Sequence, residues 1–216
     1  TPKASTVKFH AVNLHIKEAY LEEDFKSKLD LERATPIHYE TNNEEVIVEK
    51  MPIGEQVRLT FVYDYEINTN MQGAYLSKYM VEDEEHLLVS TQFESHYARE
   101  CFPCIDEPAA KATFSLTLTT PDLGDTILAN TPVKSVVKNT TIKEDKVWQS
   151  ENPHQLPEDT TPDEYVSQTA VFEDTPKMST YLLAFCIGEL KGKSRTSVHG
   201  IKVTTYCTLN HPTDSV

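Results

Sequence analysis

The sequence has few of the features that mark nucleic-acid-binding or small secreted proteins. Its 216 residues include only four cysteines and one tryptophan, and 20 Lys and Arg residues are outnumbered by 34 Asp and Glu residues. The resulting net charge of −14 at pH 7 repels phosphate backbones and anionic lipid headgroups. We therefore expect neither nucleic acid nor a membrane surface as a partner.

Long apolar runs are also missing. The longest, residues 181–188, is far shorter than the roughly 20 residues that cross a bilayer, and residues 1–17 lack the apolar block of a signal peptide. Because the chain starts at Thr1 rather than at a methionine, we expect the natural N-terminus to lie upstream. A cytoplasmic location is the working expectation.

The four cysteines are too few and too unevenly spaced for the disulfide framework of a small secreted protein, which favours a reducing compartment. Cys101 and Cys104 have the C-x-x-C spacing of a thiol redox pair or half a zinc site. No second such pair or paired-histidine cluster accompanies them, and the eight histidines are scattered along the chain. Since Pro103 and Pro108 also give the segment a rigid, loop-like character, we interpret the two thiols as packing residues.

Strand-like periodicity dominates the chain. Apolar residues at every second position predict a half-buried strand over residues 57–67 and another over residues 112–118, followed by a turn at residues 119–121. The apolar parity changes near Ala11, which predicts a bulge or break there. Residues 181–187 are apolar on both parities, as in a central strand that Gly188 ends.

Helical signals are weak, and no repeat or linker divides the chain. The best helical candidate, residues 22–33, has few periodic apolar positions. The acidic, proline-rich composition of residues 150–165 predicts a mobile surface loop. We therefore predict one domain over residues 1–216. Its fold class is all-β with little helix.

Two ordered blocks of sequence carry a resemblance to a known family. Residues 90–114, Ser-Thr-Gln-Phe-Glu-Ser-His-Tyr-Ala-Arg-Glu-Cys-Phe-Pro-Cys-Ile-Asp-Glu-Pro-Ala-Ala-Lys-Ala-Thr-Phe, form the first, and residues 176–185, Pro-Lys-Met-Ser-Thr-Tyr-Leu-Leu-Ala-Phe, form the second. Gly73, Tyr75 and Ser77 make a weaker third landmark. Together they resemble the N-terminal domain of the aminopeptidase N family of zinc metallopeptidases.

The resemblance implies a fold and a function. The implied fold consists of twisted mixed and antiparallel sheets packed as a saddle-like β-sandwich. The implied function is that of the substrate-facing accessory domain of a zinc aminopeptidase, which removes N-terminal residues from peptides. The zinc motif H-E-x-x-H and the G-x-M-E-N motif are absent from these 216 residues. We therefore expect zinc and all catalytic groups to belong to a downstream domain of the same chain. The chain alone is expected to bind no metal, to contain no catalytic residue and to be inactive.

Gln92 and Glu94 are the candidate substrate-binding residues. In an extended segment they project from one face, while Phe93 points to the other. By resemblance, Glu94 would accept a charge-assisted hydrogen bond from the α-ammonium of a peptide, and Gln92 would bond the amino end or line the first side-chain pocket. The alternative is that both are ordinary solvated residues of a strand.

Arg99, Asp106 and Glu107 lie in the same block and invite a catalytic interpretation. A scaffold role is favoured, because a guanidinium paired with a nearby carboxylate would pin the loop and hold residues 92–94 in place. A rival from another class is a non-catalytic β-sandwich that binds carbohydrate or protein, with aromatics such as Tyr63, Tyr75 and Tyr79 as a stacking platform.

Overall fold

A computed structural model describes residues 4–23, 34–42, 44–52, 56–121, 126–139 and 167–211. Within these ranges the chain is built from strands, with two short 3-10 turns, η1 (Ala98–Glu100) and η3 (Thr180–Leu182). The prediction of an all-β chain with little helix is confirmed. Most of the helical candidate at residues 22–33 and the whole acidic stretch at 150–165 lie outside the described residues.

The contacts divide the chain into two compact units, and the chain passes between them several times. One unit comprises residues 1–76, 91–112 and 177–184, and the other comprises residues 77–90, 113–176 and 185–216. The strand pairings of defined register are all antiparallel. Among the described residues, parallel pairing is limited to an isolated bridge between Asn68 and Tyr75.

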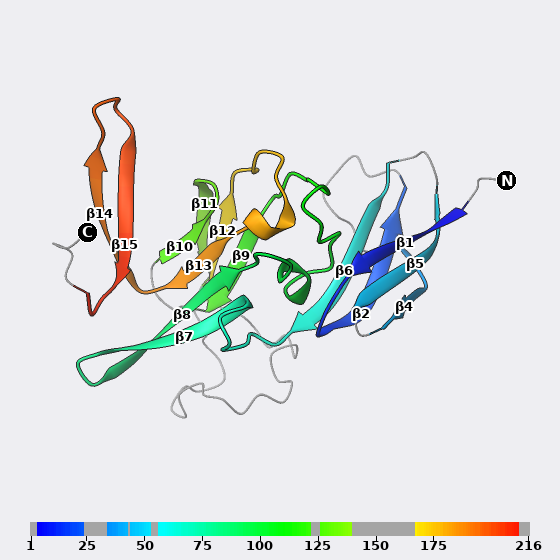
Figure 1. Cartoon of the computed structure of the whole chain (residues 1–216), viewed down its shortest axis with the longest axis horizontal. Coiled ribbons are helices and arrows are strands. Elements are labelled where there is room, and N and C mark those ends of the chain that lie inside the picture. Colours follow the sequence, from blue (N-terminus) through cyan, green and yellow to red (C-terminus); the bar gives the residue numbers. More distant parts are fainter. Residues whose placement is uncertain are drawn as a thin grey trace. The chain divides into compact units, whose positions relative to one another are not determined.

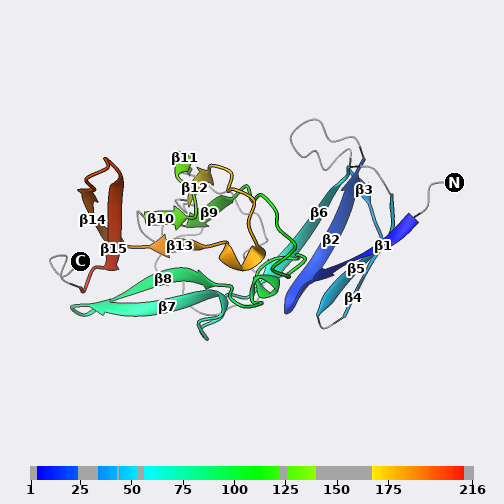
Figure 2. The ribbon, with the colours of Figure 1, turned by 45° about the horizontal axis from the view of Figure 1, so that its top comes forward.

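Two three-stranded sheets form the first unit (Figure 1). One has the order β1-β5-β4 and the other β3-β2-β6, and Figure 2 shows them from a second direction. Their strands are β1 (Ala4–His10), β2 (Leu14–Glu22), β3 (Thr35–Pro36), β4 (Tyr39–Thr41), β5 (Glu45–Pro52) and β6 (Arg58–Tyr65).

The core of this unit lies between the two sheets. Val46 and Val48 of β5 are at most 1% exposed and cluster with Ile16 of β2. Phe9 of β1 meets Phe61 of β6 edge to face, with ring centroids 5.4 Å apart. Apolar side chains of both sheets thus face one another, as in a β-sandwich.

The prediction of a strand at residues 57–67 is confirmed by β6, although all its side chains are half-buried. The predicted break near Ala11 is confirmed as well, because β1 ends at His10 and β2 begins at Leu14 in a different sheet. Asn13, between them, has a φ of 57°, the left-handed conformation that asparagine tolerates better than most residues. The break therefore carries the chain from one sheet to the other.

The second unit holds three sheets, of orders β10-β13-β8-β7, β11-β12-β9 and β14-β15. Strand β7 begins in the first unit and strand β8 ends in it, while residues 77–90 belong to the second unit. Their bounds are β7 (Gly73–Val81), β8 (Glu84–Gln92), β9 (Thr117–Pro121), β10 (Thr126–Ala129), β11 (Val133–Asn139), β12 (Ser167–Phe172), β13 (Phe185–Gly188), β14 (Leu190–Thr196) and β15 (Lys202–Thr208).

Two strand predictions were partly wrong. The strand expected at 112–118 begins only at Thr117, and the expected turn at 119–121 is part of β9, because these residues pair with Ser167–Thr169 of β12. The central strand expected at 181–187 is confirmed only in its second half, where β13 lies between β10 and β8 and ends at Gly188. Its first half is the turn η3, in which Leu182 is 47% exposed.

A buried carboxylate holds the loop that follows β8. Asp106 is 5% exposed, and its Oδ2 accepts hydrogen bonds from the Arg99 backbone N–H (3.3 Å) and Nε (3.0 Å). Its Oδ1 accepts from the Thr180 hydroxyl at 2.7 Å, and its backbone N–H donates to Nδ1 of His10 at 3.0 Å. The scaffold interpretation of Arg99 and Asp106 agrees with this arrangement.

The two sequence blocks that carry the family resemblance contact each other at this point. Besides the bond from Thr180 to Asp106, the Ser179 hydroxyl donates to the Pro108 carbonyl at 2.6 Å. Ala112 and Met178 exchange two backbone hydrogen bonds of 2.9 Å. Residues separated by more than 60 positions are therefore fixed against one another beside the end of β1.

We expect Asp106→Asn to destabilise the chain by about 3 kcal/mol, because it removes the charge that pairs with the largely buried Arg99 guanidinium. Urea unfolding followed by circular dichroism measures the change. Glu107→Gln is the matched control, since Glu107 is exposed in the same loop, and it should cost less than about 0.5 kcal/mol. Equal stability of the two variants would refute the scaffold role of Asp106.

Candidate functional site

Gln92 and Glu94 lie where β8 ends. Gln92 is the last residue of the strand and is exposed, Phe93 is 2% exposed, and Glu94 is exposed again. The Phe93 ring meets the Phe102 ring edge to face, with centroids 5.9 Å apart. The buried Phe93 thus anchors the segment, and the two polar side chains on either side of it point to solvent.

The acceptor atoms of this pair are available to a ligand. Among the described residues, the Glu94 carboxylate takes part in no hydrogen bond or ion pair. The Gln92 Nε2 donates to the Glu94 backbone carbonyl at 3.4 Å. Among the described residues the amide oxygen of Gln92 accepts no hydrogen bond, so it remains free to accept one.

A cationic amine fits such a pair. An ammonium has three donors and no acceptor, so it needs several oxygen acceptors, one of them preferably charged. Glu94 supplies an exposed carboxylate, and Gln92, two positions earlier at the end of β8, supplies an amide oxygen. Sequence reasoning paired these two residues, and both are exposed on either side of a buried phenylalanine.

The turn after Glu94 contains contacts that the sequence did not reveal. The Tyr97 backbone N–H donates to the Phe93 carbonyl at 2.9 Å, which closes a turn around Glu94, Ser95 and His96. The Tyr97 hydroxyl accepts from Gln72 Nε2 at 2.8 Å. The polar sequence Asn68-Thr-Asn-Met-Gln72 before Gly73 was the signal that could have indicated an ordered loop here.

His10 makes structural contacts that sequence reasoning missed. Its Nδ1 accepts the backbone N–H of Asp106, and its own backbone exchanges two hydrogen bonds with Cys104. His10 and Asp106 are 96 positions apart, so no local pattern links them. His15 belongs to β2 and has no part in these bonds.

The thiols of the C-x-x-C motif are in an apolar setting. Burial raises the pKa of Cys101 to about 12 and that of Cys104 to about 12. The reactive form of a cysteine is the thiolate, so both thiols are poor nucleophiles and poor metal ligands at neutral pH. All four cysteines are free, and within the described residues no group of three or more His, Cys, Asp or Glu side chains is placed to hold a metal ion.

Two of the three aromatic residues considered as a stacking platform, Tyr63 and Tyr79, have hydroxyls that are already hydrogen-bonded. The Tyr63 hydroxyl donates to the Cys101 carbonyl at 3.0 Å, and burial raises its pKa. The Tyr79 ring stacks on His86, and its hydroxyl donates to the Glu189 carbonyl. Neither ring presents a free face and a free hydroxyl together.

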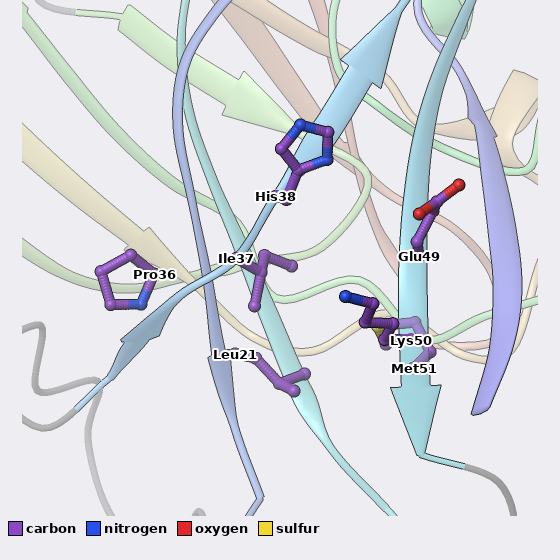
Figure 3. A pocket seen from close by; sticks show the side chains of 7 residues that line it. All are labelled: Leu21, Pro36, Ile37, His38, Glu49, Lys50 and Met51. Carbon is purple, nitrogen blue, oxygen red and sulfur yellow. The ribbon is translucent and has the colours of Figure 1, made fainter. Parts of the chain in front are cut away.

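A hollow of about 270 Å³ lies between β2, β3 and β5, away from the residues of the signature blocks. Figure 3 shows its side chains, with His38 and Glu49 at one end and Leu21 at the other. Its lining is Leu21, Pro36, Ile37, His38, Glu49, Lys50 and Met51, which does not include Gln92 or Glu94.

The part of the chain that the structure describes contains no helix long and apolar enough to cross a membrane.

Comparison with known proteins places the chain in a family. A model of the peptidase M1 N-terminal domain matches residues 2–157. Aminopeptidase N of Lactococcus lactis subsp. lactis (strain IL1403) is 35% identical over 210 residues, which are 97% of this chain and 20% of that protein. Endoplasmic reticulum aminopeptidase 1 of Rattus norvegicus is 31% identical over 205 residues, which are 94% of this chain and 19% of that protein.

The match to Lactobacillus helveticus aminopeptidase N is 33% identical over 169 residues, which are 78% of this chain and 17% of that protein. The chain thus spans about a fifth of the length of the curated relatives it matches. The family model covers more than half of the chain, and it does so in the region that contains the first signature block. The chain therefore belongs to the peptidase M1 N-terminal domain family.

Proposed function

We propose that this chain is the substrate-facing domain of a zinc aminopeptidase, in which Gln92 and Glu94 hold the free α-ammonium of a peptide. The observation that carries the proposal is the exposed Glu94 carboxylate, which has no partner among the described residues, two positions after the exposed Gln92 and with the buried Phe93 between them. The family of the chain and the names of its relatives support the activity. The rest of the protein would supply the catalytic groups.

Holding the amine serves the reaction by orientation. An exopeptidase must place the first peptide bond, and no later one, at the reacting centre, and fixing the terminal nitrogen determines that distance. The Glu94 carboxylate would balance the positive charge of the ammonium, and the Gln92 amide oxygen would accept a second hydrogen bond from it. Zinc, held by parts of the enzyme beyond this chain, would polarise the scissile carbonyl and activate water.

Several features of the chain agree with this division of labour. The sequence contains neither H-E-x-x-H nor G-x-M-E-N, so we propose that the chain alone does not hydrolyse peptides. Chelator-resistant release of a chromophore from aminoacyl anilides by the purified chain would contradict this. The proposed partners are peptides with a free N-terminus and the catalytic domain of the same protein. Four free cysteines favour a reducing compartment such as the cytoplasm.

Glu94→Gln in the full-length enzyme tests the clamp directly. The substitution keeps the size of the side chain and removes its charge, so the preference for an amine should fall about tenfold or more. The preference is measured as the ratio of the inhibition constants of isocaproyl hydroxamate and leucine hydroxamate, which differ only in the α-amino group. Cleavage of peptides with free and with acetylated N-termini provides a second readout.

Glu84→Gln is the matched control, because Glu84 is an exposed carboxylate at the other end of the same strand. It should leave the amine preference unchanged. An amine preference that survives Glu94→Gln, in an enzyme that is otherwise folded and active, would remove Glu94 from the proposal.

The rival role of Cys101 and Cys104 as a redox or zinc pair is tested by thiol labelling. In a Cys186→Ser, Cys207→Ser variant, we expect the two remaining thiols to stay unreactive at pH 8 until urea unfolds the chain, because their folded pKa is about 12. The reverse variant, Cys101→Ser with Cys104→Ser, is the control. Rapid labelling of the folded protein, or zinc retained in proportion to protein, would favour the rival.

The same pKa shifts predict how stability depends on pH. The folded pKa of both thiols lies above the ordinary value of 9.0, so their contribution to stability is fully present below pH 9.0. It should be lost as the pH rises toward about 12. Replacing both thiols by serine should therefore make the free energy of unfolding less dependent on pH in this alkaline range, as urea titrations at several pH values would measure.

A further inference from the structure

The direction of the Glu94 side chain depends on the turn that carries it. Glu94 lies between the buried Phe93 and Tyr97, whose backbone N–H closes the turn on the Phe93 carbonyl at 2.9 Å. Among the described residues the Glu94 carboxylate has no partner of its own. The conformation of the turn backbone therefore determines the direction of the Glu94 carboxylate.

Side chains of the turn are linked to one another. The Ser95 hydroxyl and His96 Nδ1 are 2.7 Å apart, and the His96 ring stacks on the Tyr97 ring with centroids 4.9 Å apart. The series ends at the Tyr97 hydroxyl, which accepts a hydrogen bond from Gln72 Nε2 at 2.8 Å. Tyr97 thus connects the turn to a segment 25 positions earlier in the sequence.

The segment that presents Gln72 is itself ordered by asparagine side chains. Asn68 Nδ2 donates to the Gln72 carbonyl at 2.8 Å, and the Gln72 backbone N–H donates to Asn70 Oδ1 at 3.1 Å. Both bonds fix the backbone of Gln72 before β7 begins. Gln72 is therefore held in place independently of Tyr97.

Gly73 brings this segment close to η1. Its φ is +65°, a conformation that glycine adopts without strain. A Cβ atom at this position would lie 3.1 Å from the Tyr65 hydroxyl oxygen and 3.4 Å from the Glu100 Cβ. Close packing against Glu100 supports the contact between the loop at residues 68–73 and the segment at residues 93–100.

We propose that Gln72 and Tyr97 are positioning residues, which set the direction of the Glu94 carboxylate and so determine how strongly the enzyme prefers a free amine. This inference rests on the proposed function of Glu94. The hydrogen bond between them joins a loop held by asparagines to the turn that carries the carboxylate. A carboxylate that is already aimed loses less conformational freedom when it binds an ammonium, which strengthens binding of the amine.

Tyr97→Phe in the full-length enzyme tests the proposal, because it removes the hydroxyl and keeps the ring that stacks on His96. We expect the amine preference, measured with leucine hydroxamate and isocaproyl hydroxamate, to fall about three- to tenfold. Gln72→Ala should lower it by a similar factor. The double variant should fall no further, because both substitutions remove one hydrogen bond.

Tyr39→Phe is the control for a structural effect. The Tyr39 hydroxyl donates to the Ile16 carbonyl at 3.0 Å, so its loss removes a hydrogen bond of similar length within the sandwich. Thermal unfolding of both variants is measured to separate a loss of stability from a change in ligand preference. Only Tyr97→Phe should change the amine preference. In a Glu94→Gln background, Tyr97→Phe should have no further effect on that preference.

The outcomes separate this inference from the function on which it rests. If Glu94→Gln lowers the amine preference and Tyr97→Phe and Gln72→Ala leave it unchanged, the positioning role is overturned and the clamp stands. Independent, multiplicative effects of Tyr97→Phe and Glu94→Gln also overturn the positioning role. If Glu94→Gln itself has no effect, both the clamp and the positioning role fail.

Discussion

The buried carboxylate of Asp106 is the constraint on which the site depends. A carboxylate that is 5% exposed is stable only when its oxygens are hydrogen-bonded, and here Arg99 and Thr180 meet that need. The Asp106 backbone adds a bond to His10. The side chain and backbone of this one residue thus link the loop after β8 to the end of β1 and to η3.

The loop that Asp106 holds begins immediately after the segment that carries Gln92 and Glu94. Phe93 is buried against Phe102, and Phe102 lies within the C-x-x-C motif, in the loop that Arg99 and Asp106 fix. The exposed side chains of Gln92 and Glu94 are therefore attached to a backbone segment that the buried Phe93 holds in place. A binding site for a small cationic group benefits from such preorganisation. A mobile carboxylate would lose conformational entropy when the ligand orders it, and the site would bind the ligand more weakly.

The sequence predicted correctly those parts of the fold that are determined by neighbouring residues. The alternation that marks β6 and the change of parity near Ala11 are properties of a few neighbouring residues, and both predictions were confirmed. The start of β9 and the turn η3 were not found, because each depends on a partner segment more than 40 positions away. The alternation of Gln92, Phe93 and Glu94 was predicted from the sequence. The hydrogen bonds of the surrounding loops, between Gln72 and Tyr97 and between Asp106 and both His10 and Thr180, came only from the tertiary structure.

We propose that the chain serves recognition of the substrate and that other parts of the protein supply the chemistry. A crystal structure of the full-length enzyme with leucine hydroxamate bound tests this account most directly. The account predicts that the ligand nitrogen lies about 3 Å from both the Glu94 carboxylate and the Gln92 amide oxygen. A ligand nitrogen held by other residues, with Glu94 left in solvent, would contradict it.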